Sequence, residues 1–207
     1  MKRSATKKAA KKKVDLYRQY AREYVTPRTP VLVTVGPAQY LAVDGQGEPG
    51  GSAFTGRIGL LYNMAFTIKM ARKFAGRDYA VSKLEGLWWR QKGDAENDPS
   101  TWRWTLMIRV PAFITAADRT RALETLAARG KDPAVADVTL LKITEGLCVQ
   151  MLHVGPYDRE AESIDRMREV AAANGRTFSG KHHEIYLSDP RRVPAARLRT
   201  ILRQPIR

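Results

Sequence analysis

Near its C-terminus the chain reads Lys181-His182-His183-Glu184-Ile185-Tyr186-Leu187-Ser188-Asp189-Pro190. Ile, Tyr and Leu favour an extended backbone, and Ser-Asp-Pro is typical of the turn that ends a strand. Alternate side chains of a strand share a face, so we expect His182, Glu184 and Tyr186 on one face and the residues between them on the other. A carboxylate in this apolar run indicates either the exposed face of a half-buried sheet or an acid that faces a pocket.

The composition of the whole chain is that of a soluble globular protein. Its 207 residues, 43 % hydrophobic and 28 % charged, suffice for one large core or two small ones. No apolar run is long enough for a transmembrane helix, and no apolar segment follows the basic N-terminus as a secretory signal requires. The single cysteine, Cys148, excludes an internal disulfide. We therefore expect a cytoplasmic protein without membrane contact.

The formal net charge is +15, and residues 1–13 carry seven basic side chains and no acidic one. This stretch predicts a disordered basic tail, followed over residues 14–30 by a short helix and a linker. Such a tail would make weak, non-specific contact with polyanions, and a nucleic-acid or partner-binding protein is the alternative that it leaves open. The tail has no interleaved aromatic residues, and no helix-turn-helix is recognisable, so we regard specific DNA binding as the weaker interpretation.

From residue 31 onward the chain repeats one order of elements. The first half predicts a strand, a long helix and two strands at Tyr40–Val43, Phe54–Phe74, Lys83–Trp89 and Trp102–Val110. The second half predicts the same elements at Leu147–Val154, Asp158–Ala173, Lys181–Leu187 and Leu198–Leu202. The Gly-rich stretch Asp44–Ser52 is expected to be a loop, and Thr120–Arg129 a further helix.

This repeat predicts an α+β fold of duplicated strand-helix-strand-strand modules. The halves would span about 31–130 and 138–207, with an antiparallel sheet, helices on one side and a central ligand cleft. Superposing the halves with a shift of one residue matches Glu85 with Glu184. Glu85 is therefore expected to be a pseudo-symmetric second acid of the same cleft.

Four blocks of sequence resemble the GyrI-like small-molecule-binding family over roughly residues 30–207. They are Leu84–Trp89, Trp104–Pro111, Gly146–Tyr157 and Lys181–Pro190. The resemblance implies tandem modules of the SHS2 type around an apolar pocket with a central glutamate. It also implies one of two activities. Relatives serve as drug-sensing halves of multidrug-responsive transcription regulators, and some stand-alone members hydrolyse the cyclopropane of DNA-alkylating natural products. Those hydrolases use a glutamate and a tyrosine beside stacking tryptophans.

Tryptophans are the expected walls of a pocket for flat molecules, because they supply much rigid area for few frozen torsions. Trp88 and Trp89 are adjacent on a strand, so one should be core and the other a wall. Parity with Glu85 favours Trp89 as the wall, although a bulge would exchange the two. The remaining candidate ligand-binding residues are Tyr186, Tyr157, Tyr62, Met107 and Met151.

Three roles are open for Glu184. A buried carboxyl group has a raised pKa and can act as a general acid or base. An ionised one attracts a lipophilic cation beside aromatic faces, and either form can make a structural hydrogen bond to Tyr186 or His182. No metal site is expected, because His182 and the adjacent His183 point apart, and no nucleotide-binding motif indicates a cofactor.

The sequence thus favours a multidrug-binding protein, of a kind that confers drug resistance, for bulky, flat, often cationic hydrophobic molecules. The alternative is a hydrolase that opens the cyclopropane ring of DNA-alkylating natural products, with Glu184 activating water and Tyr186 assisting. Whether the protein is an enzyme, which ligand is natural and what its oligomeric state is are left open.

Overall fold

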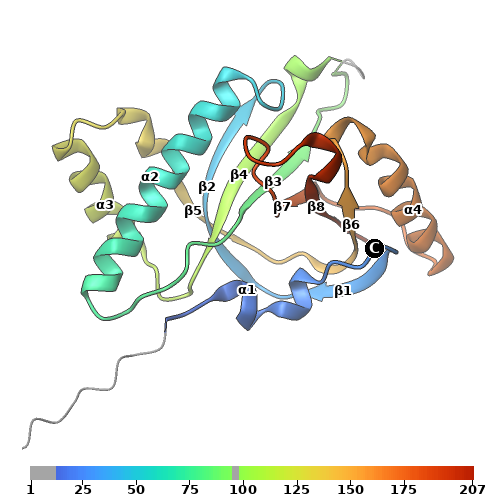
Figure 1. Ribbon diagram of the computed structural model, residues 1–207, viewed down its shortest axis with the longest axis horizontal. Coiled ribbons are helices and arrows are strands. Elements are labelled where there is room, and N and C mark those ends of the chain that lie inside the picture. Colours follow the sequence, from blue (N-terminus) through green and yellow to red (C-terminus); the bar gives the residue numbers. More distant parts are fainter. Residues whose placement is uncertain (1–12, 95–97) are drawn as a thin grey trace, which may run out of the picture.

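The computed structural model describes residues 13–94 and 98–207 (Figure 1). The predicted tail at 1–13 lies outside the described residues except for Lys13. The eight strands are β1 (Val31–Val35), β2 (Ala38–Gln46), β3 (Leu84–Trp89), β4 (Arg103–Val110), β5 (Thr139–Ile143), β6 (Gly146–Val154), β7 (His182–Tyr186) and β8 (Arg199–Pro205). They form one sheet in the order β1-β6-β8-β7-β3-β4-β2-β5, and the pairs are antiparallel.

The predicted repeat is visible in the strand order. β3 and β7 lie side by side at the centre, followed outward by β4 and β2 in one direction and by β8 and β6 in the other. Each half has the sequence strand-helix-strand-strand, and the sheet therefore has a pseudo-twofold relation between β3 and β7. The predicted α+β fold with an antiparallel sheet is confirmed.

Three longer helices accompany the sheet: α2 (Ser52–Phe74), α3 (Ala116–Ala128) and α4 (Glu160–Ala173). α2 packs on β2 and β4, α3 packs on α2, and α4 packs on β6. Leu61, Met64 and Ile68 of α2 are almost completely buried, with the spacing of one helix face. In Figure 1 the central strands lie between α2 and α4. The helices thus bury the outer strands of each half and leave the middle of the sheet for other contacts.

Two predicted boundaries need correction. β2 continues into the expected loop, because residues 44–46 pair with residues 103–105 of β4. Gly45 allows this, since a Cβ atom there would lie 2.0 Å from the Trp104 ring. α3 begins four residues before the expected start, where Thr115 and Asp118 form a capping box.

The opposite face of the sheet is covered by the N-terminal segment, with α1 (Leu16–Gln19) and the 3-10 helix η1 (Ala21–Tyr24). Tyr24 packs there against Ile185 and Ile201. The expectation of helices on one side therefore holds for α2 and α4 but not for this segment. Among the described residues, no helix has both the length and the apolar character needed to cross a membrane.

Candidate functional site

Strand β7, which contains Glu184, alternates its side chains between the two faces of the sheet as predicted. Glu184 lies beside Glu160 of α4, on the helix face, whereas His183 contacts Glu85 on the face that the N-terminal segment covers. β7 sits between β3 and β8, near the centre of the sheet. Glu184 thus stands on a central strand, between the strands on which α2 and α4 mainly pack.

Glu184 lies beside a hydrogen-bonded pair of side chains. The Trp88 indole Nε1 donates to the Tyr186 hydroxyl at 3.0 Å, and Tyr186 shares the helix face of β7 with Glu184, where each side chain shifts the pKa of the other. Glu160, the first residue of α4, approaches Glu184 from the other side, with carboxyl oxygens of the two residues within 4.8 Å, so that they can share a hydrogen bond when one is protonated. The Glu184 side chain is 13 % exposed and Glu160 is 6 % exposed, so the two carboxyl groups meet largely out of water.

Burial raises the pKa of both carboxyl groups, because an ionised carboxylate loses its hydration there. The pKa of Glu160 is raised further by the charge of Glu184 and by their hydrogen bond. Burial and the Glu184 charge also raise the pKa of Tyr186 well above its ordinary value. At neutral pH Glu160 and Tyr186 therefore keep their protons, whereas Glu184, whose pKa is raised to about 7, gains and loses its proton near neutrality.

His182 completes the cluster. Its Nε2 atom lies 3.7 Å from a Glu184 oxygen and has no hydrogen-bond partner. Burial, and then the charge of His183, lower the pKa of His182 to about 4, so its imidazole is neutral. Ligand atoms of Glu160, His182 and Glu184 lie within 4.8 Å of one another. Because burial raises the pKa of both carboxyl groups, we treat these three as proton-handling groups.

Aromatic side chains from three elements surround the acid. Phe54 of α2 stacks on Trp88 with ring centroids 5.5 Å apart, and Tyr157 meets the Tyr186 ring edge-on at 6.1 Å. Tyr157 belongs to the 3-10 helix η4 (Tyr157–Arg159) before α4 and is 37 % exposed. Burial and the nearby Glu184 charge raise its pKa to about 12. Tyr62 is half-buried on α2 and stacks on Phe66.

The structure brings Trp88, not Trp89, to Glu184. Trp88 is 8 % exposed and hydrogen-bonded to Tyr186, whereas Lys181 Nζ lies 3.2 Å from the centre of the Trp89 ring. Trp89 does share a face with Glu85, as parity predicts, but that face is opposite to Glu184. Met107 also lies on that opposite face, fully buried in a cluster with Tyr40 and other apolar residues.

The expected equivalence of Glu85 and Glu184 is corrected by the strand register. Gly86 pairs with Glu184 across β3 and β7, while Glu85 pairs with Ile185. A one-residue slip moves every side chain to the other face of a sheet, and the superposition of the halves contained such a slip. Glu85 instead accepts a hydrogen bond from Tyr24 and contacts His183 at 2.9 Å.

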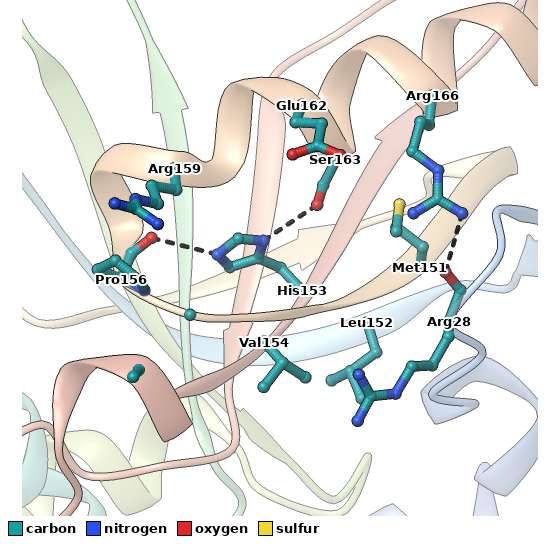
Figure 2. A pocket seen from close by; sticks show the side chains of 12 residues that line it. Arg28, Met151, Leu152, His153, Val154, Pro156, Arg159, Glu162, Ser163 and Arg166 are labelled. Carbon is teal, nitrogen blue, oxygen red and sulfur yellow. Dashed lines mark hydrogen bonds between the residues drawn. The ribbon is translucent and has the colours of Figure 1, made fainter.

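Met151 lies on the helix face but is 2 % exposed and packs with Met167 and Leu202. It borders a cavity of about 380 Å³ beside α4, which Figure 2 shows. His153 in this cavity is hydrogen-bonded to Ser163 and Pro156, at 3.0 and 3.2 Å. The lining of this cavity includes neither Glu184 nor Tyr186, so Met151 lies away from Glu184.

The sequence did not indicate Glu160 and Phe54 as site residues. An acid in the first turn of a helix is common, because it complements the helix dipole, so Glu160 has an ordinary explanation. Phe54 opens a long apolar helix and resembles a core residue. Only the approach of both helices to the central strands places these side chains at Glu184.

Fold and site together define a small-molecule-binding α+β protein with a buried acid among aromatic rings. The chain belongs to the GyrI-like small molecule binding domain family, which it matches over residues 28–207. A comparison with curated proteins finds no match.

Solved structures from Listeria innocua resemble the chain over nearly its whole length. An uncharacterized conserved protein is 34 % identical with a TM-score of 0.88, covering 94 % of this chain and 100 % of its own. A hydrolase is 33 % identical with a TM-score of 0.85 and the same coverage. The EcmrR C-terminal domain, 13 % identical with a TM-score of 0.56, covers 86 % of this chain and 97 % of its own and shares the fold alone.

Proposed function

We propose that this protein is a hydrolase of a bulky hydrophobic electrophile, with the cyclopropane ring of DNA-alkylating natural products as the reacting group. The observation that carries the proposal is the position of Glu184 on the helix face of β7, beside Tyr186, whose hydroxyl accepts a hydrogen bond from the Trp88 indole at 3.0 Å. It places an acid with a raised pKa among aromatic rings, where a general base for water is expected. The relatives of known structure at 33 % identity that are named hydrolases support the same class of activity.

The proposed reaction needs only water as co-reactant. Glu184 takes a proton from water while the water oxygen attacks the ring CH₂, and the strained C–C bond breaks. The electron pair of that bond passes to a conjugated carbonyl oxygen of the substrate, which takes a proton from solvent, and Glu184 returns its own proton to solvent. Tyr186 stays protonated, so it orients Glu184 as a hydrogen-bond donor and does not act as a base.

The test is incubation of the full chain with a cyclopropane-bearing alkylator and detection of the water adduct by mass spectrometry. We expect ring-opened product to form with catalytic turnover, well beyond one equivalent of protein. Product that never exceeds the uncatalysed rate would overturn the proposal.

A second candidate is binding without chemistry, of the flat and often cationic molecules that the sequence favours. It is favoured by the single negative charge of the carboxyl pair beside Trp88, Tyr157 and Tyr186, since aromatic faces and a carboxylate both attract cations. Titration with an ethidium-type dye, followed by tryptophan fluorescence, tests it. Saturable quenching together with no turnover of the alkylator would favour this candidate over the hydrolase.

Gly86 provides a further test of the site. It lies opposite Glu184, and a Cβ atom there would be 2.9 Å from the Tyr186 hydroxyl and 3.0 Å from Trp88 Nε1. Gly86→Ala must therefore separate the two side chains, and we expect kcat/KM for ring opening to fall about tenfold, the value of one such hydrogen bond. Gly59→Ala on α2 is the matched control, because its Cβ would meet nothing within 4 Å. Equal rates for the two variants would contradict this role of the hydrogen bond.

A further inference from the structure

Glu160 has a place in the site that sequence reasoning did not assign. It is the first residue of α4, and α4 is anchored on β6 through the buried side chains of Met167 and Ala171. This packing directs the N-terminal turn of the helix toward β7, where the Glu160 side chain meets Glu184. At 6 % exposure, Glu160 has almost no access to water.

The two carboxyl groups cannot both be ionised at such close range in a site that excludes water, because like charges there repel strongly. One of them must therefore carry a proton. Against the effect of burial, hydrogen bonding by Tyr186 and the positive charge of His183 on the other face of β7 both lower the pKa of Glu184 and so favour its ionised form. The proton consequently resides on Glu160, whose second oxygen, Oε1, is buried and has no partner.

We propose that Glu160 is a positioning residue for the proposed hydrolysis, a neutral carboxylic acid that donates a hydrogen bond to Glu184 and holds it ionised and oriented toward water. The inference rests on the proposed function. Glu160 is less exposed than Glu184, 6 % against 13 %, and we therefore assign it a positioning role. In this arrangement Glu184 accepts hydrogen bonds from two donors, Glu160 of α4 and Tyr186 of β7.

The other titratable groups that face the pair do not replace this donor. They are Tyr157 of η4, His182 and Tyr186 of β7, and His183 on the opposite face. His182 is neutral, and its Nε2 atom makes no hydrogen bond to Glu184. Among these groups, Tyr186 and Glu160 are the ones whose hydrogen bonding lowers the pKa of Glu184.

The test is a ¹³C NMR titration of full-length protein labelled at the glutamate carboxyl carbons, with the Glu184 signal assigned by its loss in Glu184→Gln. In Glu160→Ala we expect the Glu184 midpoint to rise by about one pH unit, the value of one lost hydrogen bond to a charged group. In Glu160→Gln the amide N–H replaces the donor, so the midpoint should stay close to that of the wild type. Glu162→Gln, an exposed neighbour on α4, is the control for loss of an acid alone.

Kinetics supply the second readout. The acid limb of the kcat/KM profile should move upward in Glu160→Ala by the same amount as the NMR midpoint, and return in Glu160→Gln. An unchanged Glu184 midpoint in Glu160→Ala, or equal shifts in the Ala and Gln variants, would overturn the role of Glu160 whether or not the protein turns over the alkylator. A shifted midpoint without any turnover would instead overturn the hydrolase and leave the carboxyl pair established.

Discussion

Glu184→Gln is expected to lower kcat/KM for ring-opening hydrolysis by about 10²–10⁴-fold, the usual contribution of a general base. Glutamine keeps the shape of the side chain and an oxygen that accepts from Tyr186, but it cannot take a proton from water. The measurement is initial rate by mass spectrometry for wild type and variant at the same pH. Glu162→Gln, which removes an exposed acid on α4, should keep the wild-type rate.

The same substitution should leave the fold intact and increase its stability above neutral pH. Folding raises the pKa of Glu184, so the folded state binds the proton more tightly than the unfolded chain does. A carboxyl group whose pKa is raised by folding lowers the free energy of unfolding as pH rises above its pKa in the unfolded chain. Glu184→Gln removes this destabilisation. Thermal melts at pH 8 should thus show an equal or higher Tm for the variant. Turnover that survives the substitution would contradict the role of Glu184.

His183→Leu is expected to lower the free energy of unfolding by about 3–5 kcal/mol, the usual cost of removing one partner from a buried ion pair. His183 is fully buried, with Nε2 2.9 Å from Glu85 and Nδ1 2.9 Å from Glu145. Glu145 is also held by Arg203 at 2.8 Å, and these contacts lower the pKa of Glu145 to about 2. The substitution leaves both carboxylates without the cation between them.

The pH dependence of stability distinguishes this role from simple packing. Although burial opposes it, the carboxylates of Glu145 and Glu85 raise the pKa of His183 from 6.5 to about 9. The stability that this proton supplies, about 3 kcal/mol, is fully present below pH 6.5 and is lost as pH rises through 9. Denaturant unfolding of the wild type should therefore show a decline over this window.

His183→Leu should lack that decline, and a variant that keeps it would refute the assignment. The matched control is Arg168→Ala, which removes an exposed ion pair with Asp165 and should cost no more than about 1 kcal/mol without adding a pH slope in this window. His183 and Glu184 are neighbours in sequence, yet one substitution tests the fold and the other tests the chemistry, because they point to opposite faces of β7.

Much of the fold was accessible from the sequence. The apolar spacing of residues 54–74 predicted α2, since a helix that packs on a sheet must repeat its buried side chains every three or four residues. The two halves predicted the duplicated module, because a strand-helix-strand-strand unit cannot bury its apolar face alone. The start of α3 was not predicted. The Thr115–Asp118 capping box sets it, and this box lies before the apolar residues that defined the expected helix.

The sequence by itself determined that His182, Glu184 and Tyr186 share a face, because alternation is a local property of an extended chain. It could not determine which residue of β3 lies opposite Glu184. That register depends on contacts between segments about 100 residues apart, and one step along the strand exchanges Trp88 for Trp89 and Gly86 for Glu85. Nor could it place Glu160 at the site. Only the packing of α4 on β6 brings this first-turn acid within 4.8 Å of Glu184, because that contact depends on how a distant helix docks and not on local spacing.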